Sequence, residues 1–241
     1  MNKKINKSAY NTIHSLSDFI KQLETRINDR YRIILFRGQN LDKALIPRIA
    51  RHYFKKSREI DERRMLNEFI SNSISHLEYT PKNILEHLTI AQHHGVPTRL
   101  LDWTESALTA LYFATCSTPP TNEKHVVLWS ISLERDSELL LSDANTDPFE
   151  IDKIKIFKPA NFIQRVASQH GWFSIHPSNN NGFYERAENI TDDTARINKF
   201  IIPRDNVKGI HETLEVCGVN IYTIFQDLDS LGNYIFKKYT K

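Results

Sequence analysis

The chain has 241 residues, of which 40% are hydrophobic and 25% are charged, and its formal net charge is only +3. This composition is that of an ordinary globular protein and excludes a strongly acidic or strongly basic chain. The sequence has no run of about 18 apolar residues, and no apolar run follows its basic N-terminus. We therefore expect no contact with a membrane, no secretory signal and a cytoplasmic location. Cys116 and Cys217 are too few for a disulfide framework, and we expect both to be buried thiols.

The first half of the chain predicts a helix, one strand and two further helices. Ser15 or Ser17 can cap the first helix, in which apolar residues from Phe19 to Ile27 recur at helical spacing. Residues 31–38 are rich in β-branched and aromatic side chains, which predicts a buried strand with Arg37 near its end. Apolar residues recur at helical spacing over residues 59–79 and 84–94, so both segments are predicted to be helices. Gly95 stands where the second of these helices needs a C-terminal cap.

A short extended piece and a central helix are predicted next. Residues 98–102 form the extended piece, and residues 105–115 form a helix that is apolar nearly all round, as expected of a helix in the core. Residues 125–133 predict another strand. The chain is then expected to be irregular up to residue 162, and residues 163–175 predict one or two strand pieces.

The C-terminal part predicts a strand over residues 199–203, a helix over residues 205–216 and a last helix that starts at Phe225. Asp227 is predicted to cap this last helix. Strands and helices intermix without regular alternation, and no internal repeat is present. We therefore expect an α+β fold with a small mixed or antiparallel sheet and a helical insertion between the first and second strands.

The segment most informative about function is residues 90–105. It places two histidines, an arginine, two carboxylates and a tryptophan beside a glycine and a proline, between runs that predict buried helix. Core packing does not require this mixture of polar groups, so we expect a functional site here. The candidate side chains are Gln92, His94, Arg99, Asp102, Trp103 and Thr104. His93 and His94 are adjacent and point in different directions on a helix, so we expect no metal site.

Arg37 is a second candidate. A guanidinium at the end of a buried strand is costly to desolvate unless it meets an anion, and its planar fork suits a carboxylate or a phosphate. If the anion is Asp102, the pair is structural, and if the anion is a ligand phosphate, Arg37 belongs to a binding site. Gly38 follows directly and could let the backbone approach a ligand, or it could simply make a turn.

The charges of the chain are unevenly spread. Residues 43–64 hold eight bases and three acids, whereas residues 134–150 hold six acids and one base. The basic segment could attract the phosphate of a nucleotide or a nucleic acid, or it could be a solvated helix face. The acidic segment is expected to be a surface connection. The residues assigned to a protein or nucleic-acid target are Lys43, Arg48, Arg51, Lys55, Lys56 and Arg58.

Several motifs together resemble the FRG domain family, which is named for a Phe/Tyr-Arg-Gly motif. They lie at residues 36–39, 45–48, 92–104, 165, 169–173 and 225–229. One departure is Gln226, where members of the family often carry proline. The resemblance extends from about Phe19 to Tyr234. It implies a single FRG-like domain over residues 1–241, with the Arg-Gly strand and a helical part at 15–94 and a sheet-rich part at 95–241.

The order of the predicted elements also resembles that of the ADP-ribosyltransferases. This resemblance implies that Arg37 holds the phosphate or ribose of a dinucleotide, that Trp103 stacks on nicotinamide and that Thr104 supplies a hydroxyl. Cleavage of an N-glycosidic bond creates oxocarbenium character, which a carboxylate stabilises. The transferases usually supply a glutamate on a late strand, where this chain has the neutral Gln169, which can only hydrogen-bond a ribose hydroxyl. Asp102 or Glu105 could supply the charge instead, or could orient neighbouring cations.

The leading hypothesis is a nucleotide-binding domain that acts on NAD, as an ADP-ribosyltransferase or NAD glycohydrolase in a toxin or phage-defence effector. The predicted catalytic residues are Arg37, His94, Asp102 and Gln169. The predicted cofactor-binding residues are Arg37, Gly38, Gln92, Arg99, Trp103 and Thr104. One alternative is a non-catalytic module that recognises nucleic acid or a nucleotide. The other is a hydrolase that uses His94 with Asp102.

Overall fold

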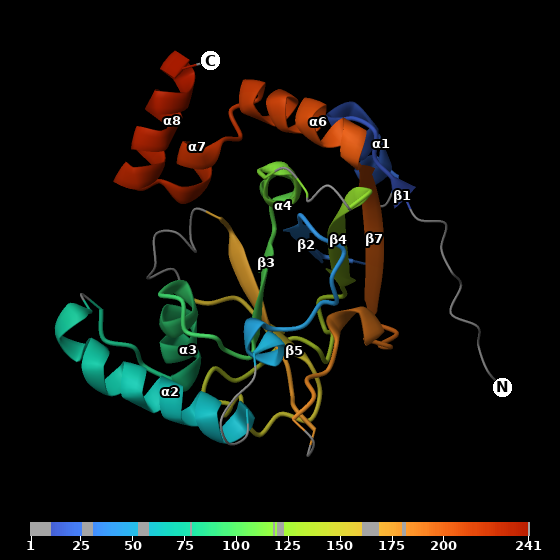
Figure 1. Ribbon diagram of the computed structural model, residues 1–241. Helices are drawn as coiled ribbons and strands as arrows, with labels where there is room; N and C mark the ends of the chain where they lie inside the picture. Colours follow the sequence, from blue (N-terminus) through green and yellow to red (C-terminus); the bar gives the residue numbers. More distant parts are fainter. Residues whose placement is uncertain are drawn as a thin grey trace. The chain divides into compact units, whose positions relative to one another are not determined.

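The computed structural model describes residues 11–25, 31–52, 58–77, 79–117, 119, 123–160, 169–179 and 182–240. The chain divides into two units, each built from separate stretches of sequence (Figure 1). Unit 1 contains Met1–Lys43, Ser106–Ser132 and Arg196–Lys241. Unit 2 contains Ala44–Glu105 and Leu133–Ala195. Helices and strands occur together in a mixed arrangement, and the expected α+β fold is confirmed. The expectation of a single domain stays a prediction.

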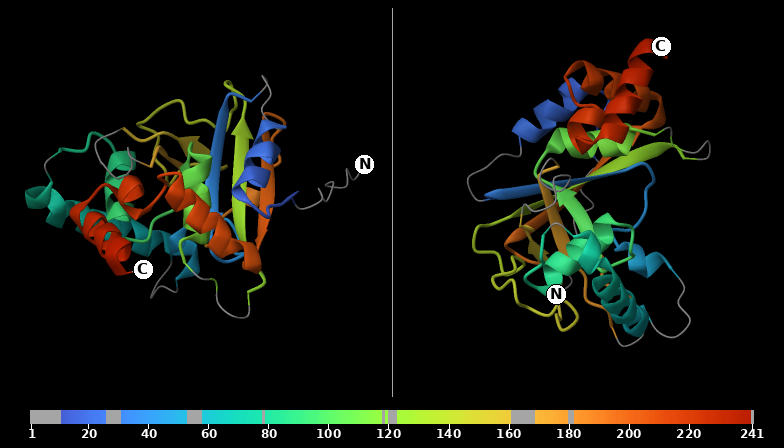
Figure 2. Two further views of the ribbon diagram at one scale, coloured as in Figure 1. Left: turned by 90° about the horizontal axis from the view of Figure 1, so that it is seen from above. Right: turned by 90° about the vertical axis from the view of Figure 1, so that its left-hand side faces the viewer.

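In the part of unit 1 that the structure describes, four strands lie side by side in the order β1-β7-β4-β2 (Figure 2, left). These strands are β1 (Asn11–Thr12), β2 (Ile33–Gln39), β4 (His125–Leu133) and β7 (Ala195–Pro203). β1 runs parallel to β7, with Asn11 opposite Phe200. Eight of the nine residues of β4 are buried, as expected of a strand covered on both faces. The strands predicted at residues 31–38, 125–133 and 199–203 are therefore confirmed, and the last of them begins earlier than expected.

The helices of unit 1 are α1 (Leu16–Glu24), α4 (Ala107–Thr115), α6 (Arg204–Val216), α7 (Ile221–Phe225) and α8 (Leu228–Thr240). The apolar helix α4 packs on β2 and α6 and lies in the core of the unit, as predicted. The predicted last helix is present as α8 but begins at Leu228, three residues later than expected, because the backbone of Gln226 takes a left-handed conformation with φ of 55°. The short helix α7, which Gln226 ends, was not predicted. Asp227 then caps α8 by accepting a hydrogen bond from the amide of Ser230 at 2.7 Å.

The described residues of unit 2 form an antiparallel arrangement in the order β3-β6-β5 and two longer helices. Its strands are β3 (Leu100–Thr104), β5 (Lys155–Phe157) and β6 (Gly171–Ile175), and its helices are α2 (Arg58–Ser73) and α3 (Ile84–His93). Three 3-10 turns complete the unit at Arg48–Arg51, Ile74–His76 and Ala187–Asn189. Side chains from α2, α3, β3 and β6 form its core, among them Leu66, Leu88, Leu100 and Phe173. β5 has only three residues, too few to show a periodic pattern, and the sequence analysis missed it.

Two further expectations can be compared with the structure. The helical insertion is confirmed, because α2, α3 and two 3-10 turns separate β2 from β3 in the chain. The expectation of buried thiols is wrong, since Cys116 and Cys217 are both exposed at the ends of their helices. The part of the predicted strand before Gln169 lies outside the described residues. No helix in the described parts of the chain is long and apolar enough to cross a membrane.

Candidate functional site

Arg37 and Gly38 lie in β2, which belongs to unit 1. Arg37 is partly buried. A Cβ atom at Gly38 would come within 1.9 Å of the backbone oxygen of Ala110 and 2.6 Å of the backbone nitrogen of Ala114. Glycine is therefore needed at this position so that β2 can lie directly against the backbone of α4. The structure gives Gly38 a packing role, and the cofactor-binding roles of Arg37 and Gly38 stay predictions.

The motif at residues 90–105 lies in unit 2, where it leads from the end of α3 into β3. Gly95 has φ of 90°, a conformation that favours glycine, and its amide donates to the carbonyl of Gln92 at 3.0 Å. The amide of Val96 donates to the carbonyl of Ala91 at 2.9 Å. The predicted cap at Gly95 is confirmed, and it turns the chain from α3 toward β3.

Gln92 and Asp102 are brought together across this turn. The Gln92 amide nitrogen donates to Asp102 Oδ1 at 2.8 Å, and the Gln92 amide oxygen accepts from Thr98 Oγ1 at 2.5 Å. Because Thr98 is buried and accepts a bond from the amide of Leu100, the orientation of the Gln92 amide is fixed. Asp102 is exposed. A side chain from α3 thus holds the carboxylate of Asp102 in one direction while leaving it open to solvent.

Arg99, in contrast, lies inside unit 2. Its side chain and that of Glu62 are each only 1% exposed, and Arg99 Nη2 lies 2.8 Å from Glu62 Oε2. Arg99 Nη1 donates to the carbonyl of Pro148 at 3.0 Å, and the guanidinium carbon lies 4.1 Å from the ring centroid of Phe149. Tyr184 donates a further hydrogen bond to Glu62 at 2.9 Å. This guanidinium joins three parts of the chain, and we remove Arg99 from the proposed ligand-binding residues.

Sequence reasoning did not single out Glu62, although a signal was present. Glu62 stands four residues before Leu66 and seven before Phe69, so it lies on the apolar side of α2. A carboxylate on the buried face of a helix needs a cation, because an isolated buried charge is strongly disfavoured. Arg99, in an otherwise apolar segment, is that cation.

Trp103 is also buried, with 3% of its surface exposed. Its indole nitrogen donates to Ser174 Oγ at 2.9 Å, and Ser174 Oγ lies 2.8 Å from His176 Nε2. His176 Nδ1 lies 2.7 Å from the carbonyl of Glu185, so Nδ1 carries the proton and Nε2 accepts from Ser174. Trp103 therefore links β3 to β6 from within the core. We remove it as a platform for nicotinamide.

Two hydrogen bonds join the end of β3 to the residues just before β6. The Thr104 hydroxyl donates to the backbone oxygen of Gln169 at 2.5 Å, and the amide of Glu105 donates to the backbone oxygen of His170 at 3.1 Å. His170 has φ of 48°, a left-handed conformation that is uncommon for histidine. Gln169 is partly exposed, and its side-chain nitrogen is buried without a hydrogen-bond partner among the described residues.

Glu105 is held at the same end of the strands. The Trp172 indole nitrogen donates to Glu105 Oε1 at 3.0 Å, and Lys158 Nζ lies 3.3 Å from the same carboxylate. Glu105 is nevertheless exposed. We call Asp102, Glu105, Gln169 and His170 the β3 edge. It contains two of the four predicted catalytic residues.

His94 follows the end of α3 and is exposed. Its ring stacks at 6.4 Å from the ring of Phe69 and lies edge-on to the ring of His93 at 4.9 Å. The hydrolase hypothesis, which pairs His94 with Asp102, stays a prediction. Among the described residues, no group of three or more potential metal ligands lies together.

Several basic side chains of residues 43–64 form hydrogen bonds or ion pairs within unit 2. Arg48 donates to the carbonyl of Gly95 at 3.1 Å. Arg51 donates to two backbone carbonyls at 3.2 and 3.3 Å, and burial lowers its pKa. Arg63 binds the acidic segment, at 2.9 Å from Glu150. Lys43 is exposed in unit 1, whereas Lys55, Lys56 and the side chain of Arg58 lie outside the described residues. A role in binding a target stays a prediction for these bases.

Comparison with known proteins identifies one family. The profile of the FRG domain matches residues 32–123, which include β2, the helical insertion and the Gln92–Asp102 contact. The motifs after residue 123 that carry the wider resemblance lie outside this match. Neither the curated proteins nor the solved structures gave a match, so the likeness to ADP-ribosyltransferases stays a prediction. Residues 32–123 match the FRG domain, and this match supports the resemblance of the chain to the FRG domain family.

Proposed function

We propose that the β3 edge binds a nucleotide, with NAD as the ligand, and that the chain acts on it as an ADP-ribosyltransferase or NAD glycohydrolase. The observation that carries the proposal is the buried side-chain nitrogen of Gln169, which has no hydrogen-bond partner among the described residues. A buried donor without a partner costs about 1–3 kcal/mol, so an acceptor supplied by a ligand would stabilise it. A ribose hydroxyl oxygen is such an acceptor.

The position of Asp102 supports the proposal. Alternate residues of a strand point to the same face, so Asp102 and Thr104 share one face of β3. Thr104 holds the backbone of Gln169 on that face. The rise along a strand places Asp102 about 7 Å from Thr104. An exposed carboxylate held by Gln92 thus lies about two residues along β3 from the threonine that binds the backbone of Gln169.

This pair suits cleavage of the bond between ribose C1′ and the nicotinamide nitrogen. When that bond breaks, nicotinamide leaves with the bonding electron pair and C1′ gains positive charge, which a carboxylate stabilises. Water or a nucleophile of a target then bonds to C1′ and loses a proton. In this proposal Asp102 stabilises the charge, Gln169 binds a ribose hydroxyl, and Gln92 is a positioning residue for Asp102. Consumption of NAD would suit a toxin or phage-defence effector.

The test measures NAD binding by calorimetry, nicotinamide release, and transfer of labelled ADP-ribose to proteins of a cell extract. We expect Asp102→Asn to lower the rate about 100-fold, the size of effect seen when one group that stabilises transition-state charge is removed. We expect Gln169→Ala to weaken NAD binding about tenfold. Asp136→Asn, at an exposed turn of unit 2, is the matched control and should behave as wild type. No NAD binding and no nicotinamide release by the wild-type chain would reject the proposal.

One observation favours a second candidate function, recognition of a nucleotide without turnover. Gln169 is neutral at the position where the transferase resemblance expects a glutamate, so the β3 edge has one carboxylate fewer for stabilising charge. For a recognition module, the same assays would show NAD binding that Gln169→Ala weakens, and no nicotinamide release by any variant.

A further inference from the structure

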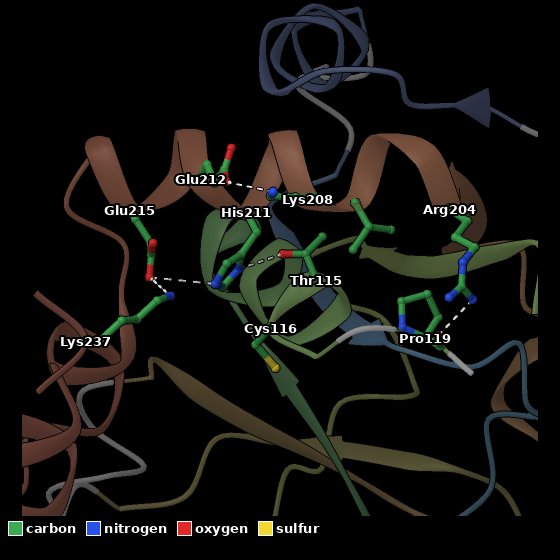
Figure 3. A pocket seen from close by; sticks show the side chains of 10 residues that line it. Thr115, Cys116, Pro119, Arg204, Lys208, His211, Glu212, Glu215 and Lys237 are labelled. Atoms are coloured by element: carbon green, nitrogen blue, oxygen red, sulfur yellow. Dashed lines mark hydrogen bonds and ion pairs between the residues drawn. The ribbon is translucent and has the colours of Figure 1, made fainter. Parts of the chain in front are cut away.

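A pocket of about 420 Å³ in unit 1 has no part in the proposed function. It lies between α6 and the C-terminal end of α4, with one lysine contributed by α8 (Figure 3). We call it the α6 pocket. Its lining residues are Thr115, Cys116, Pro119, Arg204, Val207, Lys208, His211, Glu212, Glu215 and Lys237. Its volume is in the range of pockets that hold small molecules.

Two cations lie on the pocket face of α6. Arg204 and Lys208 are four residues apart, which places them on the same side of the helix about 6 Å apart along its axis. The apolar side chain of Val207 lies between them on the chain and also lines the pocket. Arg204 Nη1 donates to the carbonyl of Pro119 at 2.8 Å, which holds the guanidinium at the pocket wall. Arg204 is also the first residue of α6, where the helix dipole favours negative charge.

The two glutamates that line the pocket do not neutralise the end that carries Arg204 and Lys208. Glu215 lies toward the other end of the pocket, where Lys237 donates a hydrogen bond to it and His211 Nε2 lies 3.8 Å away (Figure 3). Glu212 is 3.9 Å from Lys208, but the two side chains are 56% and 88% exposed. An ion pair that is so exposed contributes little and is easily exchanged for another partner. Lys208 can therefore turn to an anion in the pocket at little cost.

The middle of the pocket has fixed groups. The Thr115 hydroxyl donates to the carbonyl of Leu111 at 2.9 Å, so its contact of 3.3 Å with His211 Nδ1 makes it an acceptor. The imidazole is thereby held between Thr115 and Glu215. This arrangement commits the threonine hydroxyl to two partners, and it does not serve as a nucleophile. The α6 pocket is thus suited to binding.

We propose that the α6 pocket binds a small organic anion, a carboxylate or a phosphate ester with an apolar body. Its charged group would lie between Arg204 and Lys208, and its apolar body would lie against Val207 and Pro119.

The test titrates the full chain with phenyl phosphate, with benzoate and with the neutral benzamide, by calorimetry and by the imidazole NMR signals of His211. We expect at least one of the two anions to bind and to shift the His211 signals, and benzamide to bind at least tenfold more weakly. Lys208→Ala should weaken anion binding about tenfold, or about 1.4 kcal/mol. Lys21→Ala, at an exposed position of α1 in the same unit, should leave it unchanged. Which anion binds more tightly identifies the charged group of the natural ligand.

Two results would overturn this assignment. One is the absence of binding by both anions, and the other is equal affinity of the wild type and Lys208→Ala. Nicotinamide release by Lys208→Ala should equal that of the wild type, because Lys208 is not at the β3 edge. The NAD assay therefore tests only the proposed function of the β3 edge, and the anion titration tests only the α6 pocket. A negative result in one does not affect the other.

Discussion

Single residues of the family motif turn out to be required for packing. Gly38 allows β2 to lie against the backbone of α4, and its neighbour atoms belong to a helix that cannot easily move. Arg99 is held by Glu62 inside unit 2, and Trp103 is held by Ser174. At the scale of the residue, much of what makes the motif distinctive therefore specifies how the fold is assembled.

The first prediction concerns Gly38→Ala. The added methyl group would overlap the backbone of Ala110, so we expect the free energy of unfolding to fall by about 3 kcal/mol. The matched control is Gly209→Ala in α6, where an added Cβ meets nothing within 4 Å. Alanine is favoured over glycine inside a helix, so this control should be more stable by about 0.5–1 kcal/mol. Urea unfolding measures both, and equal stability of Gly38→Ala and wild type would contradict the packing argument.

At the scale of the element, the side chains of strand β3 alternate between a buried face that packs in the core and an exposed face that carries the candidate catalytic carboxylate. Trp103 points into the core and links β3 to β6, whereas Asp102 is exposed and is held by Gln92 of α3. The alternation of side chains along a strand makes this separation possible, since neighbouring residues face opposite sides. The rigid partners on the buried side fix the direction of the exposed carboxylate.

In unit 1, Asp42 connects two strands. Its carboxylate accepts from Lys199 of β7 at 2.6 Å and lies 3.1 Å from His125 Nε2 of β4. Burial by itself would raise the pKa of Asp42, but the hydrogen bonds from Lys199 and His125 outweigh it, and the pKa is lowered. A carboxyl group whose pKa is lowered in the folded state stabilises the protein at pH values above the ordinary pKa of aspartate. That contribution is lost as the pH falls through the lowered pKa.

The second prediction follows from this sign. At neutral pH we expect Asp42→Asn to lower the free energy of unfolding by about 1 kcal/mol, a value that allows for screening by solvent. At a pH of about 2, below the ordinary range of aspartate, the difference from wild type should shrink toward zero, because both side chains are then largely neutral. Urea unfolding at several pH values measures the change. A difference that is the same at all pH values would show that the carboxylate charge is not responsible.

At the scale of the whole molecule, the two units are interleaved in sequence. The segment that matches the FRG domain, residues 32–123, includes β2 and α4 of unit 1. Most of its other residues belong to unit 2. Several partners of the matched residues come after it in the chain. Ser174 is the partner of Trp103, Pro148 of Arg99, and Tyr184 of Glu62. The matched segment is therefore incomplete as a packed structure.

The third prediction is that residues 32–123 do not fold alone. Without β6, the indole nitrogen of Trp103 and one edge of β3 lose their partners, and without β4 and β7 the core of unit 1 loses Val126, Leu128 and Phe200. The isolated segment should show no cooperative urea transition, and its amide NMR signals should be poorly dispersed. The full chain should unfold cooperatively and give well-dispersed signals. A sigmoidal transition in the isolated segment would contradict this view.

The sequence alone determined the main elements, because their signals are local. Apolar periodicity identified α2, α3 and α4, a run of β-branched and aromatic residues identified β2, and Gly95 identified the end of α3. The errors of the sequence-based prediction are also confined to short segments. β5 is too short to have a pattern, and the left-handed conformation of Gln226 moves the start of the last helix from Phe225 to Leu228.

Only the tertiary structure decided which polar residues of the motif are inside and which face solvent. Arg99 and Asp102 are three residues apart and each carries one charge, of opposite sign, yet the first is buried against Glu62 and the second is exposed beside Gln92. The difference depends on partners 37 and 10 residues away in the chain, which the local pattern does not encode. Charge and hydrogen-bonding capacity are properties of the residue, but desolvation and pairing are properties of the folded neighbourhood.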